Sequence, residues 1–223
     1  MSSLAVVAFG GNALLRSSQV GTADEQEQNA YETCRNLLGM IRRGDRLVIT
    51  HGNGPQVGNI YLRSDAGYSI YKLPKMPLDI SVADSQGEIG YMIERMMRNL
   101  LIEEGIDRKV VTVLTQVVVD KEDPAFNIPT KPVGPYYLKE EADLMTKTNG
   151  WIFKEDARSR GWRRVVASPK PLDIVNKEVI CELAQQGYIV IACGGGGIPV
   201  FIDEKNTYRP IENAVIDKDL ASA

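Results

Sequence analysis

Short runs of apolar residues alternate along this chain with longer stretches in which apolar positions recur at helical spacing. Residues 4–9 form a short, β-prone apolar run that ends at Gly10-Gly11, and residues 47–49 and 189–192 repeat the pattern. A β-branched run extends from Val110 to Val119. Continuous apolar runs of this length are typical of strands that are covered on both faces.

Helical periodicity separates the predicted strands. Apolar residues recur every three or four positions between Asp24 and Arg43, between Ile89 and Leu100, and between Ile174 and Leu183. Glycines at positions 44, 105 and 187 provide the stop signals. The alternation of strand and helix predicts an α/β fold with a mostly parallel sheet, in which ligands bind at the carboxyl ends of the strands.

The alternation breaks between Asp120 and Trp162, where the chain is polar and rich in proline. A structureless stretch of this length is unusual inside a compact domain, so we expect an excursion or lid inserted into one domain that covers residues 1–223. Residues 214–216 look like a strand and residues 217–223 like a helix just beginning. Because so short a helix is marginal alone, we expect the domain to be incomplete at its C-terminus.

Composition narrows the possible partners and the compartment. The chain has 223 residues and a net charge of −3, from 26 Lys and Arg against 29 Asp and Glu, so no basic face points to a nucleic acid. No apolar run approaches the roughly 20 residues that span a bilayer, and the first residues do not resemble a secretory signal. Three widely spaced cysteines fit free thiols in a reducing compartment. We therefore expect a cytoplasmic protein without membrane or nucleic-acid partners.

Three predicted strands end in glycine-rich turns. The turns are Gly10-Gly11-Asn12, Gly52-Asn53-Gly54 and Gly194 to Gly197. Glycine lets backbone N–H groups approach an anion closely, and a helix that follows adds its positive end. Any one of these turns could serve only to reverse the chain. Three of them at one edge of a sheet, two with an Asn amide, favour a phosphate site.

Two lysines are candidates for stabilising a transferring phosphoryl group. The sequence has no P-loop motif, and a kinase without one still needs fixed positive charge at the phosphate. Lys131 lies between Pro129 and Pro132, and Lys218 lies between Asp217 and Asp219. The alternatives are a surface-loop lysine and a helix cap with a solvated charge.

Other residues allow weaker interpretations. His51, the only histidine, could be a general base or metal ligand, but a structural hydrogen-bonding role is more common at a strand end. Ser85 is expected to cap the start of a helix. The spacing Gly52-x-Gly54-x-x-x-Gly58, with Asp79 as the ribose contact, is a loose match to a dinucleotide-binding oxidoreductase.

Taken together, several segments resemble the carbamate kinases of the amino acid kinase family. The matching segments follow one another in order along almost the whole chain: residues 10–14, 51–58, 85–87, 89–91, 123–126, 129–135, 161–166, 168–171, 194–200 and 214–220. Ile211-Glu212-Asn213 departs from the Gly-Val-Glu that the family usually has there.

The resemblance implies a three-layer αβα sandwich, typically a homodimer, that moves a phosphoryl group between Mg-ATP and carbamate. In such enzymes the reaction often makes ATP from ADP and carbamoyl phosphate during arginine catabolism. It also implies that a lid subdomain protrudes at residues 121–164. Because carbamate is already an anion, its attacking oxygen needs no general base, and positioning with charge neutralisation suffices.

The resemblance also implies roles for individual residues. Gly10, Gly11, Asn12, Gly52 and Asn53 would hold carbamate and the transferred phosphoryl group. Lys131 would close over them from the lid, and Lys218, oriented by Asp219, would neutralise charge on the transferring oxygens. Gly194, Gly195, Gly196 and Asp217 would lie on the nucleotide side, and no protein residue is expected to be a dedicated metal ligand.

The family continues well beyond the Asp-Lys-Asp turn and carries much of its adenine pocket there. We therefore expect part of the nucleotide site to be missing from this chain. An alternative function is a catalytically inactive relative that binds a small anion such as carbamoyl phosphate and regulates a partner.

Overall fold

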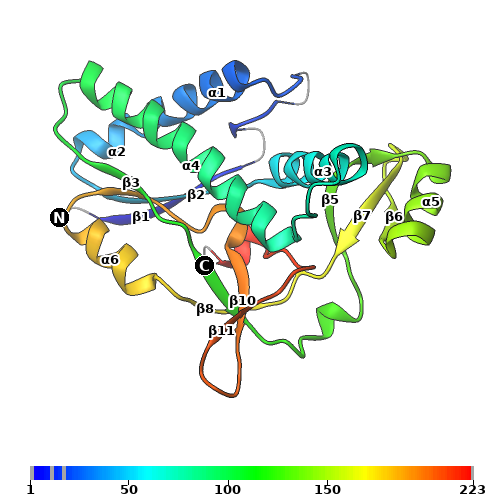
Figure 1. Cartoon of the computed structure of the whole chain (residues 1–223). Coiled ribbons are helices and arrows are strands. Elements are labelled where there is room, and N and C mark those ends of the chain that lie inside the picture. The colour runs from blue at the N-terminus through cyan, green and yellow to red at the C-terminus, as the bar shows by residue number, and fades with distance from the viewer. Residues whose placement is uncertain (1–2, 11–12, 17–18, 222–223) are drawn as a thin grey trace.

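The structure, a computed structural model, describes residues 3–10, 13–16 and 19–221. Strands and helices alternate through most of the chain (Figure 1). The strands are β1 (Leu4–Phe9), β2 (Arg46–His51), β3 (Val110–Thr112), β4 (Gln116–Val119), β5 (Lys131–Tyr137), β6 (Ile152–Glu155), β7 (Trp162–Val166), β8 (Pro171–Ile174), β9 (Ile189–Ile191), β10 (Ile198–Ile202) and β11 (Tyr208–Pro210). The helices are α1 (Ala23–Arg35), α2 (Leu38–Arg42), α3 (Gly54–Tyr71), α4 (Leu78–Glu103), α5 (Lys139–Asn149), α6 (Lys177–Gln185) and α7 (Lys218–Ala221), with 3-10 turns at Pro124–Phe126 (η2) and Gly194–Gly196 (η3).

The first sheet is parallel throughout, in the order β1-β2-β9-β3. Successive side chains of its strands enter opposite layers. Leu47 and Ile49 of β2 join the cluster beneath α1, α2 and α4, whereas Val48 joins the cluster under α6. The sheet therefore lies between two helical layers, as the predicted α/β sandwich requires (Figure 1).

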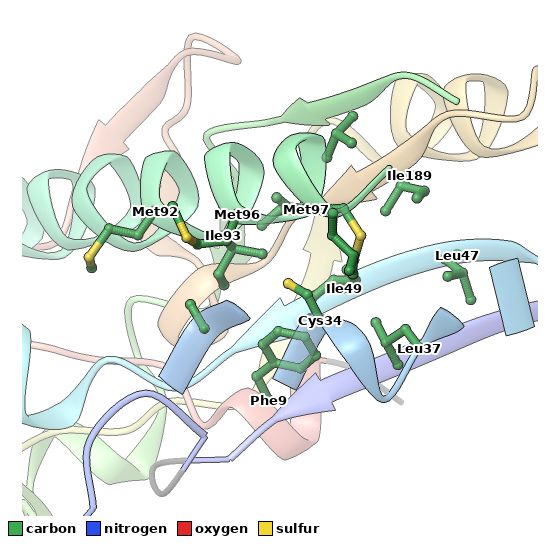
Figure 2. Close-up of a cluster of buried hydrophobic side chains, with 14 of the residues drawn as sticks. Phe9, Cys34, Leu37, Leu47, Ile49, Met92, Ile93, Met96, Met97 and Ile189 are labelled. Carbon is green, nitrogen blue, oxygen red and sulfur yellow. The ribbon is translucent and has the colours of Figure 1, made fainter. Parts of the chain in front are cut away.

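The larger core cluster lies between this sheet and α4. Figure 2 shows Ile93 and Met97 of α4 above Ile49 and Phe9 of the strands, with Cys34 of α1 between the layers. Cys34 is buried and unpaired, and burial raises the pKa of its thiol to about 12. Cys193 and Cys181 are also free, which confirms the predicted absence of a disulfide framework among them.

A second sheet has the order β11-β10-β4-β8. Strands β10 and β4 are parallel, whereas β11 and β8 pair with them in the antiparallel sense. The run from Val110 to Val119 thus forms two strands in two sheets, with Thr115 between them. The buried N–H of Thr115 donates to the side chain of Gln86 at 2.8 Å, which satisfies this amide where the chain passes from one sheet to the other.

A third, antiparallel sheet has the order β5-β7-β6, and α5 packs on it. In Figure 1 this unit stands to one side of the two other sheets. It forms from the proline-rich segment that shows no strand signal in the sequence. Its aromatic residues hold it together: Tyr137 and Phe153 meet edge to face, and the Arg164 guanidinium lies over Trp151 and Tyr61.

Several predicted boundaries are wrong. The stretch 24–43 is two helices, because the N–H of Leu37 bonds to the carbonyl of Cys34 and tightens the chain before α2. Ile174 ends β8 and precedes α6. Residues 214–216 form only an isolated bridge between Ala214 and Ala167, so the strand predicted there is not present, although all three side chains are buried.

Among the described residues, no helix is both long and apolar enough to cross a bilayer.

Candidate active site

A cleft of about 260 Å³ opens where β2, β5 and β9 meet the segment before α7. Five of the predicted site residues line it: Gly52, Asn53, Lys131, Gly195 and Lys218. The remaining lining is largely apolar and comes from Leu14, Gly54, Pro55, Gln56, Val57, Pro132, Val133, Val215 and Ile216. The cleft therefore combines two ammonium groups, glycine turns and an apolar wall.

The N-terminus of α3 forms one wall of the cleft. Asn53 is its N-cap residue and Pro55 lies in its first turn, an arrangement that starts a helix well. The first backbone N–H groups of a helix have no partner within it and carry partial positive charge. Helix α3 is absent from the prediction, although the Asn-Gly-Pro sequence is a start signal. Its first turn provides the donors that an anion needs.

The glycine turn after β9 packs against Asn53. Gly195 has φ +64°, and a Cβ there would lie 2.1 Å from Nδ2 of Asn53. A Cβ on Gly196 would lie 2.7 Å from the carbonyl oxygen of Ile216. Gly194 and Gly196 are buried beside Gly195 and do not line the cleft. Glycine is required here by close backbone approach as well as by conformation.

The two candidate lysines are paired with carboxylates at the start of α7, Asp217 just before the helix and Asp219 within it. The ammonium of Lys131 lies 2.5 Å from Oδ2 of Asp217, and this contact lowers the pKa of the Asp217 carboxyl below its usual value. Lys218 pairs with the exposed Asp219. The N–H of Asp219 donates to Oδ1 of Asp217 at 2.9 Å. Asp217 thus links the third sheet to the turn that carries Lys218.

A buried set of polar side chains fixes the turns from behind. Gln86 donates to the carbonyls of Thr115 and Gly194 at 3.2 and 2.9 Å, and accepts from the N–H of Thr115. Ser85 accepts from the amide of Asn53 at 2.8 Å. Ser85 is therefore not the helix cap predicted from the sequence, because α4 begins seven residues earlier at Leu78.

Sequence reasoning missed Gln86 and Thr115 as supports of the site. One pattern in the sequence could have indicated such a role: Ser85 and Gln86 are spaced to lie on the same helix face as the buried Val82 and Ile89. Polar residues on such a face need partners, but which turns provide them depends on the fold.

His51 is fully enclosed behind the same turn. Its Nδ1 lies 3.1 Å from the carbonyl oxygen of Gly52, and burial lowers the pKa of the imidazole to about 4. It does not line the cleft. The arrangement favours the structural interpretation, a neutral imidazole packed against Gly194.

Three predicted binding residues lie elsewhere or outside the described part. Gly11 and Asn12 lie outside the described residues. Gly10 follows β1 and is not among the described residues that line the cleft.

The dinucleotide interpretation is wrong for this chain. Asp79 is buried at the start of α4 and does not line the cleft. Gly58 is needed for helix packing and not for a nucleotide, since a Cβ there would lie 2.3 Å from Cα of Gly134 in β5. It permits close packing of α3 on the third sheet.

The donor set fits a magnesium ion that arrives with a nucleotide better than a resident metal. No group of three or more His, Cys, Asp or Glu side chains in the described ranges could hold a metal ion. Asp217 and Asp219 are the carboxylates beside the lysines. Mg²⁺ in phosphoryl-transfer sites uses one or two carboxylates together with substrate phosphates and water.

An α/β sandwich with a helix N-terminus, glycine turns and two lysines at one cleft defines a protein built to hold a small phosphorylated anion. The chain belongs to the amino acid kinase family, whose sequence model matches residues 3–223. Its relatives place it with the carbamate kinases of that family.

The carbamate kinase of Pyrococcus horikoshii is 53% identical over 97% of this chain and 68% of its own length. That of Pyrococcus furiosus is 50% identical over 99% of this chain and 69% of its own length. The chain thus spans about two thirds of these relatives. The predicted resemblance is confirmed.

Solved structures agree with the sequence relatives. The Giardia lamblia carbamate kinase bound to citric acid is 42% identical and superposes with a TM-score of 0.90, over 99% of this chain and 70% of that one. The same enzyme bound to AMP-PNP gives 0.86 at 43% identity, over 99% of this chain and 68% of that one. The predicted fold class is confirmed.

Proposed function

We propose that the protein is a phosphotransferase that moves a phosphoryl group reversibly between ATP and carbamate. The observation that carries this proposal is the cleft that brings Lys131 and Lys218 together with the first turn of α3. Its support is the identity of about 50% to proteins named carbamate kinase. The relatives favour this activity over an inactive anion-binding protein.

In the direction that makes ATP, a terminal phosphate oxygen of ADP attacks the phosphorus of carbamoyl phosphate. The bond between that phosphorus and the carbamate oxygen breaks, and carbamate leaves with the electron pair. No proton has to move, which suits a cleft whose described lining contains no histidine or carboxylate. Charge stabilisation and alignment remain as the tasks of the protein.

Each proposed role follows from position. Gly52 lines the cleft with its own N–H bonded to the carbonyl oxygen of Phe9, so the N–H groups of Asn53 and of the start of α3 hold carbamate and the transferring phosphoryl group. Lys131 comes from β5 of the third sheet and Lys218 from the start of α7, so that two separate elements provide positive charge to the cleft. Asp219 orients Lys218, and Asp217 with Gly194 to Gly196 lies on the nucleotide side. Magnesium, bound mainly by the nucleotide, supplies further charge neutralisation.

We also propose that the segment 121–164 acts as a lid. The contact that supports this role is the ion pair between Lys131 and Asp217, since it joins the third sheet to the turn of Lys218. A homodimer and a place in arginine breakdown stay predictions from the resemblance, and a cytoplasmic location stays a prediction from composition.

The test is production of ATP from ADP, Mg²⁺ and carbamoyl phosphate by the purified protein and its Lys131→Ala variant. Loss of one positioned charge from a phosphoryl-transfer site is expected to lower kcat/KM by about 100-fold or more, as for loss of an oxyanion donor. Lys147→Ala is the matched control, because Lys147 lies on α5 of the same unit and is exposed.

Two outcomes would contradict the proposal. Absence of ATP formation by the wild-type protein, together with absence of Mg-ATP binding in calorimetry, would favour the anion-binding alternative. Equal turnover by Lys131→Ala and Lys147→Ala would remove the role of Lys131 while leaving the activity intact.

A further inference from the structure

A second hollow lies at the amino ends of the parallel strands, whereas the candidate active site lies at their carboxyl ends. Its volume is about 490 Å³, and it is lined by Gly44, Arg46, Asp107, Arg108, Lys109, Gln186, Gly187 and Tyr188. These residues begin or precede β2, β3 and β9, whereas the glycine turns of the cleft follow β2 and β9. The hollow is therefore distinct from the candidate active site.

Positive charge dominates the lining. The lining contains three positively charged side chains, those of Arg46, Arg108 and Lys109, and one carboxylate, that of Asp107. Within the described ranges, neither Arg46 nor Lys109 forms an ion pair, and Nε of Arg46 is buried without a hydrogen-bond partner. Because that Nε is itself inaccessible to solvent, an anion in the hollow would meet the other N–H groups of the Arg46 guanidinium and the ammonium of Lys109.

Arg108 is already fixed in place. Its Nε donates to the carbonyl oxygen of Gly187 at 3.0 Å, and Nη1 donates to that of Asp45 at 2.9 Å. A guanidinium has five N–H donors, so three remain for a ligand. Because two bonds hold the planar group, little further conformational entropy is lost when an oxyanion binds.

Two features oppose an anion here. The C-termini of α2 and α6 lie beside the hollow, since Gly44 and Gly187 follow these helices, and the partial negative charge of a helix C-terminus disfavours an anion. Arg108 offsets part of that effect through its bond to the carbonyl of Gly187. The carboxylate of Asp45, which also acts on Arg108, is already paired with Arg43, so three positive charges face the one unpaired carboxylate of Asp107 and outweigh the remainder.

We propose that this hollow binds a compact anion with two or more negative charges, of the phosphate-ester or dicarboxylate class, between Arg46, Arg108 and Lys109. Tyr188 forms an aromatic wall beside it, with the ammonium of Lys109 6.0 Å from the ring centroid. The site is independent of the transfer reaction proposed for the cleft.

The test is an NMR titration of backbone amides with inorganic phosphate, and separately with malonate, at about 0.1 M salt so that distant charges are screened. At least one anion is expected to shift the amides of residues 46, 108, 109 and 188 in a saturable way. The anion that binds more tightly identifies the ligand class.

Variants locate the binding. Arg46→Gln is expected to raise the dissociation constant for the anion at this hollow about 10-fold or more. If Arg46→Gln does not fold, Lys109→Gln, at an exposed position, tests the same expectation. Two controls are expected to leave this dissociation constant unchanged. Arg42→Gln removes the same charge from the ion pair with Glu104, and Lys131→Ala removes a charge from the cleft. Shifts confined to the glycine turns, or wild-type binding by folded Arg46→Gln or Lys109→Gln, would overturn the proposal.

Discussion

His51 shows how one residue can be tied to the site without touching a ligand. A Cβ on Gly194 would lie 2.4 Å from Nε2 of His51, so the ring and the turn pack directly on each other. The imidazole is enclosed, and burial lowers its pKa to about 4. The ring therefore stays neutral at physiological pH, and its contact with Gly194 does not depend on pH in that range.

The buried imidazole predicts how stability depends on pH. Below pH 6.5 the unfolded chain binds a proton at His51 that the folded chain does not bind until about pH 4. Unfolding therefore becomes easier as pH falls from about 6.5 to 4, by about 3 kcal/mol from this group. Denaturant unfolding at several pH values measures the change, and His51→Gln should lack this component.

Because the chain has one histidine, NMR titration of its ring protons reports His51 without ambiguity. A midpoint near 6.5 in the folded protein would show that the ring is not enclosed as described.

At the scale of elements, α3 connects the third sheet to the cleft. Its first turn lines the cleft, and its side at Gly58 meets Gly134 of β5, the strand that begins with Lys131. The Arg164 guanidinium lies over Tyr61 of α3 and Trp151 of the third sheet. The position of Lys131 relative to Lys218 thus depends on how closely α3 and β5 pack.

Gly58→Ala tests this dependence. The added Cβ would lie 2.3 Å from Cα of Gly134, so β5 must move away from α3. We expect a loss of about 1–3 kcal/mol in unfolding free energy, typical of overpacking, and at least about 10-fold lower kcat as Lys131 shifts.

Gly67→Ala on the same helix is the control for this experiment. Its Cβ would make an ordinary contact of 3.4 Å with Leu73, so it should stabilise the helix by about 0.5–1 kcal/mol. Equal stability and turnover of the two variants would show that close packing of α3 on β5 does not set the site.

At the scale of the whole molecule, burial is unevenly distributed. Strand β9 is buried at each of its three positions, whereas the edge strand β6 has no buried residue and α5 buries only Ala142. The core between the parallel sheet and α4 therefore has far more apolar contact than the third sheet. Segments with little buried apolar surface open locally at lower free energy than the core.

Native-state hydrogen exchange tests this division. Amides of β2 and β9 should exchange only through global unfolding, and those of α5 and β6 through a smaller opening that leaves the core intact. Mass spectrometry of peptides after timed exchange measures both. Equal protection of β6 and β9 would mean that the third sheet unfolds together with the core.

The sequence alone determined the elements whose side chains are uniformly apolar. β1, β2 and β9 were predicted to within two residues at each end from their short apolar runs. Only β9 is buried at every position, as such a run predicts, whereas the edge strand β1 leaves Leu4 and Val6 exposed. The motifs around Gly52, Lys131, Gly194 and Lys218 likewise indicated a phosphate chemistry and the family.

Only the tertiary structure decided what surrounds those motifs. Helix α3 and the first turns of α4 have mixed polar and apolar residues, and the strands of the third sheet lie in a proline-rich segment, so no local period identifies them. The hydrogen bond of Gln86 to Gly194 and the contact of Asn53 with Gly195 join residues more than 100 positions apart. Such contacts arise from chain topology, since burial selects a polar partner by its position in space and not along the chain.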